Sequence, residues 1–270
     1  TEIVQLLRRR TDYPYLDIIG LQYFSGTQKV SLKRLKRELE SLDAFARSLR
    51  DELGFTVREL EFGPGFPVPY FAPGEFDEYA FLEGFSELLD GLRCGAHITL
   101  ELGRSIAASC GTYLTRVVDV KRSRGQNYAI LDGGMHHLAY YGQQLGMHTP
   151  PCRCYPARTG KPQPWNLCGA LCTVNDILAK QLPVVGLKCG DLFAFENAGA
   201  YCMTEGLSLF LSRALPPVVL LQQGGATQLV REALPTDTLN TPSYERTIYY
   251  GKTVCYSGVA PARRGLRHLP

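Results

Sequence analysis

The chain has 270 residues, of which 45% are hydrophobic and 20% charged, and its formal net charge is +3 at pH 7. This ordinary globular composition excludes a disordered, collagen-like or coiled-coil chain, and the small net charge gives no strong field for nucleic acid. No apolar run approaches the roughly 20 residues of a membrane-spanning helix, and the first ten residues lack the apolar core of a secretory signal. We therefore expect a cytoplasmic globular protein that binds neither nucleic acid nor membrane.

The first hundred residues alternate between strand and helix character. Helices are predicted for residues 2–10, 32–53 and 75–92, and strands for 16–24, 55–62 and 98–101. Gly54 is a natural C-terminal cap for the second helix, and the apolar run 16–24 is typical of a strand buried on both faces. Such alternation predicts parallel β/α architecture, and three strands are too few to close a barrel of about eight. We expect a partial β/α barrel over residues 1–105, with most of the barrel outside this chain.

Beyond residue 105 the pattern changes to short strands. Strands are predicted for residues 113–121, 128–131, 165–171, 191–195 and 217–222, and helical periodicity is confined to 173–181 and 202–213. The polar residues 122–126 predict a hairpin between the first two of these strands. We therefore expect a mainly antiparallel β domain over residues 106–223. Residues 224–270 are weakly patterned and are expected to form a mobile tail, or an extension whose partner is absent.

The cysteines and histidines do not predict a metal site. Nine cysteines, an odd number, are scattered along a chain that is large enough to fold without disulfides, which favours reduced thiols. Cys152 and Cys154 form the one close pair, and His148 completes no regular zinc spacing, so we interpret them as loop cysteines. We interpret His136 and His137 as lying on extended chain, with their rings on opposite faces and one ring exposed.

Three loops follow the predicted parallel strands: Gly26-Thr27-Gln28, Gly63-Pro64-Gly65 and Glu101-Leu102-Gly103-Arg104. Active sites of β/α barrels are assembled at that end of the strands. The first two loops offer small residues and backbone N–H groups just before a helix, which suits a phosphate. Arg104 can bind a phosphate through two N–H groups. A glycine at such a turn usually serves geometry alone, so the phosphate hypothesis depends on the convergence of the three loops.

Six motifs occur in order: Gly20–Gln28, Glu61–Phe66, Glu101–Arg104, Leu131–Met135, Cys172 with Asp176, and Gly190-Asp191 with Gly199–Tyr201. Over about residues 15–222, their order and spacing resemble the C-terminal two-thirds of the pyridoxal-phosphate decarboxylases related to diaminopimelate and ornithine decarboxylase. The resemblance implies an alanine-racemase-like barrel followed by a β domain. It also implies pyridoxal 5'-phosphate as cofactor and decarboxylation of an amino acid as activity.

The resemblance assigns roles residue by residue. Glu101 matches the acid that pairs with the pyridine nitrogen, because a protonated ring is the better electron sink for the carbanion left by departing carbon dioxide. The residues that match the phosphate cradle are Thr27, Gly63, Gly65 and Arg104. Tyr201 matches a tyrosine near the cofactor. Cys172 matches the cysteine that each subunit lends to its partner, so a homodimer with shared active sites is implied.

Read without the family, the same residues have plainer interpretations. Glu101 would be a buried carboxylate paired with Arg104. Cys172 would be a packed apolar cysteine, and Tyr201 a core residue. Asp132 would be a turn residue after a strand.

The sequence also departs from the family pattern. The Schiff-base lysine of the family lies upstream of these motifs, and the lysines of this chain stand outside its position. Phe24 replaces a histidine that stacks on the cofactor ring; it can stack but cannot donate a proton. Pro64, in the middle of the phosphate loop, has no N–H to offer. Thr173 stands where an acidic residue commonly reads the substrate amino group.

A further departure is that the segment after Met135 lacks the arginine that holds a distal carboxylate in diaminopimelate decarboxylase. We therefore expect a substrate other than diaminopimelate, with an amino acid carried on a larger scaffold as one candidate. The alternative hypotheses are a non-catalytic paralogue or partner subunit of such a decarboxylase, and a generic β/α phosphate-binding module.

Overall fold

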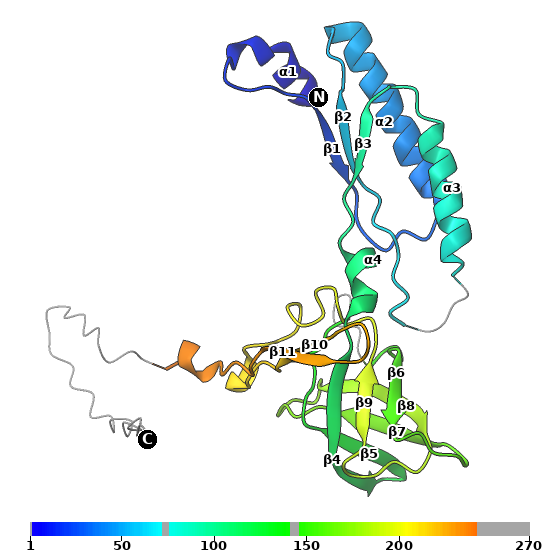
Figure 1. Cartoon of the computed structure of the whole chain (residues 1–270), viewed down its shortest axis with the longest axis vertical. Helices are drawn as coiled ribbons and strands as arrows, with labels where there is room; N and C mark the ends of the chain where they lie inside the picture. The colour runs from blue at the N-terminus through cyan, green and yellow to red at the C-terminus, as the bar shows by residue number, and fades with distance from the viewer. Residues whose placement is uncertain (1, 72–75, 141–145, 242–270) are drawn as a thin grey trace, which may run out of the picture.

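The computed structural model describes residues 2–71, 76–140 and 146–241. Three parallel β/α units occupy one end of the molecule and a curved β-sheet occupies the other, with the short helix α4 (Arg104–Ala107) between them (Figure 1). Among the described residues, no helix is both long and apolar enough to cross a membrane. The predicted order, a partial β/α barrel followed by a mainly antiparallel sheet, agrees with this arrangement.

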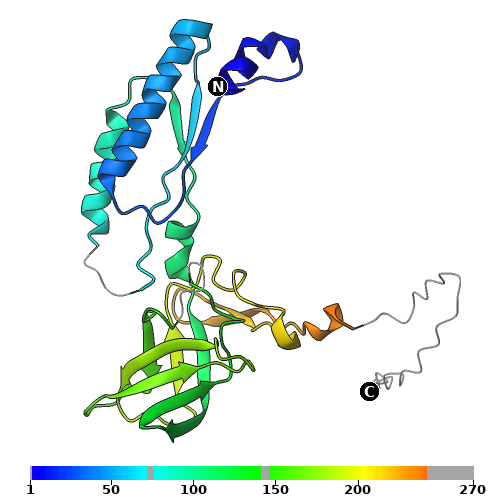
Figure 2. The same ribbon diagram turned by 180° about the vertical axis from the view of Figure 1, so that it is seen from behind.

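The first sheet is parallel and has the order β1-β2-β3. Its strands are β1 (Gly20–Phe24), β2 (Glu59–Gly63) and β3 (His97–Leu100). Helices α2 (Leu32–Leu53) and α3 (Glu78–Asp90) cover one face (Figures 1 and 2). The N-terminal helix α1 (Glu2–Arg8) is followed by a 3₁₀ turn (Arg10–Asp12), and its Leu7 belongs to the same buried cluster as Leu49 of α2.

Local sequence explains the long helix. The Ser31 hydroxyl accepts the Arg34 N–H at its start, and four leucines of one stripe are buried: Leu35, Leu39, Leu42 and Leu49. Gly54 ends the helix at φ 62°, a left-handed conformation that glycine adopts without steric cost. The predicted helix and its cap are therefore confirmed. The next helix begins in the same way, with Asp77 accepting the Ala80 N–H at 3.0 Å.

The prediction that residues 16–24 form a strand buried on both faces is wrong. The strand starts only at Gly20, and Phe24 is 59% exposed. Alternate side chains such as Leu21 and Tyr23 pack against the helices. Gln22 lies on the opposite face in register with Glu61 and Thr99, where the described residues provide no covering layer. An apolar strand sequence is thus half-buried because only one face of the sheet is covered.

The second sheet has six strands in the order β6-β9-β4-β5-β7-β8. They are β4 (Tyr113–Ser123), β5 (Gln126–Leu131), β6 (Cys152–Tyr155), β7 (Gln163–Cys168), β8 (Ile177–Val184) and β9 (Leu192–Phe195). All neighbours pair antiparallel except β5 and β7. The hairpin predicted around residues 122–126 is confirmed, because β4 and β5 pair directly across it. A core of buried residues that includes Leu131, Leu167 and Phe193 fills the curve of the sheet.

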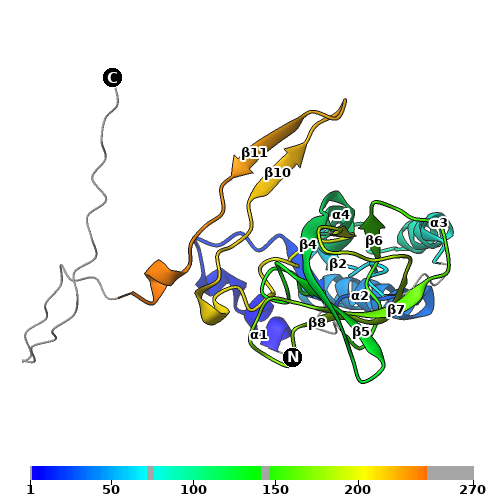
Figure 3. The ribbon, with the colours of Figure 1, turned by 90° about the horizontal axis from the view of Figure 1, so that it is seen from below.

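Two predicted helical segments are wrong. Residues 177–184 form β8, which pairs with β7, so pairing overrode the weak periodicity of 173–181. In 202–213 only a 3₁₀ turn (Phe210–Ser212) forms; two more such turns lie at Ala108–Cys110 and Asp237–Leu239. The hairpin of β10 (Val218–Leu221) and β11 (Thr227–Arg231) projects away from the body (Figure 3). Its second strand was not predicted, and residues 242–270 of the predicted tail lie outside the described residues.

Candidate active site

A pocket of about 720 Å³ opens where the parallel strands end, between the first sheet and the sheet domain. Most of the residues predicted for the site line it: Phe24, Thr27, Gly65, Glu101, Arg104 and Tyr201. Gln22, which was not predicted, lines it too. The convergence of the three loops, on which the phosphate hypothesis depends, is therefore present in the structure.

The two glycine loops lie directly against each other. Gly65 has φ +61°, and a Cβ at this position would overlap the carbonyl oxygen of Gly26. Gly63 packs against the Phe24 ring, because a Cβ on Gly63 would stand only 2.7 Å from Phe24 Cδ2. Gly63 is therefore placed beneath the pocket lining, and Gly65 is required by both backbone conformation and space.

Glu101 directly follows β3, on the uncovered side of the sheet. Its side chain is exposed, and its Oε2 accepts a hydrogen bond from Gln22 Nε2 at 2.7 Å. The charge of Glu101, together with desolvation, raises the pKa of the neighbouring Glu61 carboxyl above its usual range. The interpretation of Glu101 as a buried carboxylate is wrong. It is instead an exposed acid in the pocket lining, oriented by the amide of Gln22.

Arg104 is the cation of the pocket, and its side chain is only 13% exposed. Its Nη1 donates to the Tyr70 hydroxyl and its Nη2 to Glu205 Oε1, each at 3.1 Å. The guanidinium also lies 4.7 Å from the centre of the Tyr201 ring. Burial disfavours the charge, but the hydrogen bonds from Arg104 to Tyr70 and Glu205 prevail and raise the pKa of Arg104. The site thus holds a permanent positive charge at a fixed place.

Tyr70, Glu205 and Gln22 were missed by sequence reasoning. Tyr70 and Glu205 come from segments 34 and 101 residues away from Arg104, so no local motif links them. Tyr201 was found, and at 50% exposure it is not a core residue. A Cβ on Gly103 would stand only 2.7 Å from the Tyr201 hydroxyl, so a larger residue in the third loop would collide with Tyr201.

Cys172 does not line this pocket. It is exposed on the loop between β7 and β8, so its interpretation as a packed apolar cysteine is wrong. The buried Asp176 shapes that loop by accepting the N–H groups of Leu171 and Met135, each at 2.8 Å. The loop and the segment after β5 are consequently held together, and Cys172 is presented to the outside.

The interpretation of the histidine pair is wrong as well. His136 and His137 lie on a turn rather than on extended chain, their ring centres are 3.8 Å apart, and neither ring is exposed. The turn forms because the N–H groups of His137 and Leu138 both donate to the Gly134 carbonyl. Cys152 and Cys154 lie on strand β6, not on a loop. Within the described ranges, no cluster of three or more histidine, cysteine, aspartate or glutamate side chains could hold a metal ion.

The pocket residues suit pyridoxal phosphate in their chemistry. A buried guanidinium beside two close-packed glycine loops fits a phosphate, the Glu101 carboxylate in the pocket lining fits a ring nitrogen, and two aromatic side chains fit a planar ring. Among the described residues that line the pocket, none is a lysine that could attach the cofactor covalently. Lys29, close to Thr27 in sequence, has a fully buried side chain in an ion pair with Glu38 at 2.7 Å.

Residues 17–199 match the family described as "Pyridoxal-dependent decarboxylase, C-terminal sheet domain". The chain belongs to this family. Pyridoxal phosphate is the cofactor of these decarboxylases, and the resemblance stated from the motifs is thereby confirmed. The matched range includes the loops after all three parallel strands and all six strands of the second sheet.

Two curated decarboxylases and one solved structure show how this family member compares with others. It is 34% identical to diaminopimelate decarboxylase of Vibrio cholerae, covering 84% of this chain and 53% of the relative. It is 27% identical to L-glutamyl-[BtrI acyl-carrier protein] decarboxylase of Niallia circulans, covering 83% and 55%. The fold matches diaminopimelate decarboxylase of Helicobacter pylori complexed with L-lysine at a TM-score of 0.74 and 23% identity, covering 88% and 57%. The chain therefore spans about half the length of the curated relatives it matches.

Proposed function

We propose that this chain forms the carboxyl-end half of the active site in a pyridoxal-phosphate-dependent amino-acid decarboxylase. The observation that carries the proposal is the pocket itself, because it gathers Glu101, Arg104 and the glycine loops from three separate strands at the strand ends. Family membership alone does not establish that these residues meet in one pocket of this chain. This arrangement supports an enzyme of this class more directly than a generic phosphate-binding module, because phosphate binding alone requires no acid in the pocket lining.

The chain's own residues have distinct tasks in this proposal. When bound, pyridoxal phosphate supplies an electron sink for the carbanion that remains when carbon dioxide leaves. Arg104, already oriented by Tyr70 and Glu205, binds the phosphate, while Thr27 and the backbone around Gly65 line the phosphate end. Glu101 holds a proton at the pyridine nitrogen. Phe24 and Tyr201 exclude water from the ring.

The proposal concerns the intact protein, because the family attaches its cofactor to a lysine whose position lies upstream of these motifs. Cys172 is exposed and lies outside the pocket of its own chain, which supports its assignment to the site of a partner subunit. We therefore include a head-to-tail homodimer with shared active sites in the proposal. Cross-linking of a cysteine-substituted pair across the two subunits would test it.

For the substrate we propose an amino acid other than meso-diaminopimelate. Thr173 offers no negative charge to an amino group, and the segment after Met135 lacks an arginine for a distal carboxylate. The relative from Niallia circulans is named for a carrier-linked glutamyl group, which makes a carrier-linked amino acid one candidate here. Release of carbon dioxide from a panel of free and carrier-linked amino acids tests this. Efficient conversion of meso-diaminopimelate would contradict the substrate proposal.

A second candidate function is a non-catalytic partner subunit. Pro64 favours it, because this buried residue in the phosphate loop cannot donate an N–H to a ligand. One experiment distinguishes the two candidate functions. The intact protein alone should release carbon dioxide if it is the enzyme, whereas a partner subunit should do so only when mixed with an active paralogue.

A further inference from the structure

Gln28 and Lys29 connect the loop after β1 to the loop after β2. Gln28 Nε2 donates to the Val68 carbonyl at 2.9 Å, and the Val68 N–H donates to Gln28 Oε1 at 2.7 Å. The Lys29 N–H donates to the Gly65 carbonyl at 2.9 Å. Three hydrogen bonds therefore fix the segment that carries Thr27 against the segment that carries Gly65.

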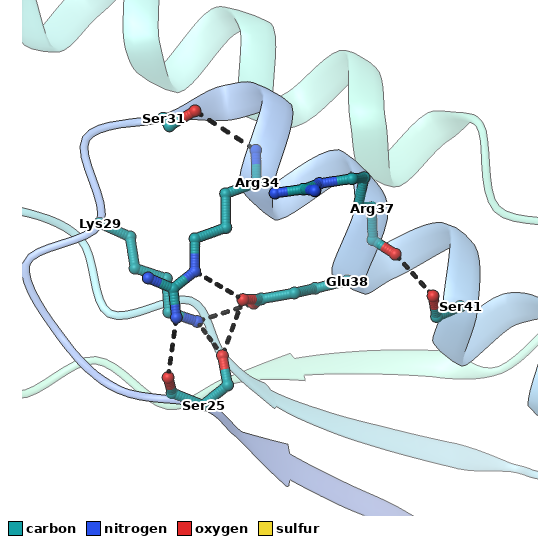
Figure 4. Close-up of polar contacts among 7 residues, drawn as sticks. All are labelled: Ser25, Lys29, Ser31, Arg34, Arg37, Glu38 and Ser41. Atoms are coloured by element: carbon teal, nitrogen blue, oxygen red, sulfur yellow. Dashed lines mark hydrogen bonds and ion pairs between the residues drawn. The ribbon is translucent and has the colours of Figure 1, made fainter.

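The Lys29 side chain attaches the same loop to helix α2. Its Nζ lies 2.7 Å from Glu38 Oε2 and 2.8 Å from Ser25 Oγ, and Arg34 Nε donates to the other carboxylate oxygen, Glu38 Oε1, at 3.1 Å (Figure 4). Burial alone would raise the pKa of the Glu38 carboxyl, but the hydrogen bonds from Lys29, Ser25 and Arg34 lower it below its usual range. The Glu38 carboxylate is consequently stabilised in its charged form by three hydrogen-bond donors.

The contacts of Gln28 and Lys29 carry an energetic cost that joining β1 to α2 does not itself require. The Lys29 side chain is fully buried, and a buried charge is tolerated only with good partners. Gln28 has φ 57°, a left-handed conformation that strains any residue other than glycine. Neither residue is among the described residues that line the pocket, whereas Thr27 and Gly65 are. Any effect of Gln28 and Lys29 on a ligand must therefore pass through their neighbours.

We propose that Gln28 and Lys29 are positioning residues that hold the Thr27 and Gly65 loops in the arrangement that receives the phosphate end of the cofactor. This inference rests on the proposed function and deepens it. Loops that are already in place bind an anion without first losing conformational freedom, so their fixation appears as affinity for the phosphate. The pyridine end, held by Glu101, should be indifferent to the contacts of Gln28.

The test compares Gln28→Ala, Gln28→Met and the exposed control Gln223→Ala in the intact protein. Each is titrated with pyridoxal phosphate and with pyridoxal, which lacks the phosphate. Gln28→Ala should weaken binding of pyridoxal phosphate about ten-fold, the change expected when hydrogen bonds of ordinary net strength are lost. Pyridoxal binding should stay unchanged. Gln28→Met keeps the length of the side chain and adds no charge but loses both hydrogen bonds, so its effect should equal that of Gln28→Ala.

Each outcome is informative. Equal weakening of both ligands, or no weakening of either, would overturn the positioning role. Wild-type protein that binds neither ligand would overturn the proposed function and this inference with it. If Gln28→Ala fails to fold, the ratio of the two affinities in Gln28→Met decides. Amide hydrogen exchange without ligand gives an independent readout, because residues 63–68 should exchange faster in Gln28→Ala and not in Gln223→Ala.

Discussion

Arg104 Nη2 and Glu205 Oε1 lie 3.1 Å apart, and this ion pair joins helix α4 to the segment that follows β9. The cation of the pocket therefore depends on a residue of the sheet domain for its orientation. Tyr201, from the same segment as Glu205, stacks on the guanidinium. The pocket therefore needs residues from both the β/α half and the sheet domain.

The first prediction concerns Glu205→Ala. Loss of the partner of a mostly buried guanidinium should lower the free energy of unfolding by about 1 kcal/mol, since one of the two groups is partly exposed to water. Urea denaturation measures this. Arg153→Ala removes a more exposed ion pair, with Glu196 at 2.7 Å, and should change stability by no more than a few tenths of a kcal/mol. Equal effects of the two variants would contradict the role assigned to Glu205.

The second prediction compares two glycines with nearly the same backbone conformation. Gly65→Ala should destabilise by more than about 2 kcal/mol, because it adds an overlap with the Gly26 carbonyl to the strain of φ +61°. Gly54→Ala at φ +62° meets no atom within 4 Å and should cost only about 1 kcal/mol. Denaturation curves measure both. If the two costs were equal, the loops would not be in close contact.

The third prediction separates the roles of Glu101 and Arg104. Glu101→Ala in the intact protein should leave pyridoxal phosphate bound and reduce decarboxylation by at least about a hundred-fold, because a developing charge loses its electrostatic partner. Arg104→Ala should chiefly weaken binding of pyridoxal phosphate and leave pyridoxal binding unchanged. Titration and carbon dioxide release distinguish the two. Normal rates and affinities in both variants would show that the site is elsewhere.

The fourth prediction is a pH dependence that arises from His136. Burial lowers the pKa of this histidine to about 4, against about 6.5 in the unfolded chain. Between these values the unfolded state binds the extra proton, so stability should fall as the pH decreases from about 6.5 to 4 and level off below. The maximal loss is on the order of 3 kcal/mol. Denaturation of wild type and His136→Asn at pH 7 and pH 4.5 measures it, and an unchanged difference between them would contradict the assignment.

The fifth prediction concerns the loop that presents Cys172. Asp176→Ala should lower the free energy of unfolding by about 2–4 kcal/mol, because two buried N–H groups lose their acceptor. Asp176→Asn keeps the shape and should restore part of this stability. Hydrogen exchange at Met135 and Leu171 localises the change. Exchange that stays slow at both amides would show that another group holds the loop.

Much of the β/α half could be predicted because its signals are local. The leucine spacing of α2, the caps at Ser31 and Gly54, and the glycine loops at the strand ends all act within a few residues. Most of the pocket lining followed from that pattern and from the family resemblance. The helix predicted at 173–181 failed because short apolar segments carry little periodic information, and pairing with β7 decided the outcome.

The residues that sequence reasoning missed act across long separations. Gln28 binds Val68, 40 positions away, and Arg104 binds Glu205 across 101 positions. No spacing rule reveals such pairs, because the fold alone brings them together. The two-sided burial expected for residues 16–24 failed for a related reason, since burial depends on what covers a sheet and not on the strand itself.

The burial of Lys29 also gives the protein a built-in chemical reporter. Amines acylate readily only when solvent and reagent reach them, and among the described lysines Lys29 alone is buried while the others are exposed. A mild labelling reagent should therefore mark the others and spare Lys29 as long as the strand-end loops stay closed. Mass spectrometry of the labelled peptides would then show, at a single residue, when the loops open.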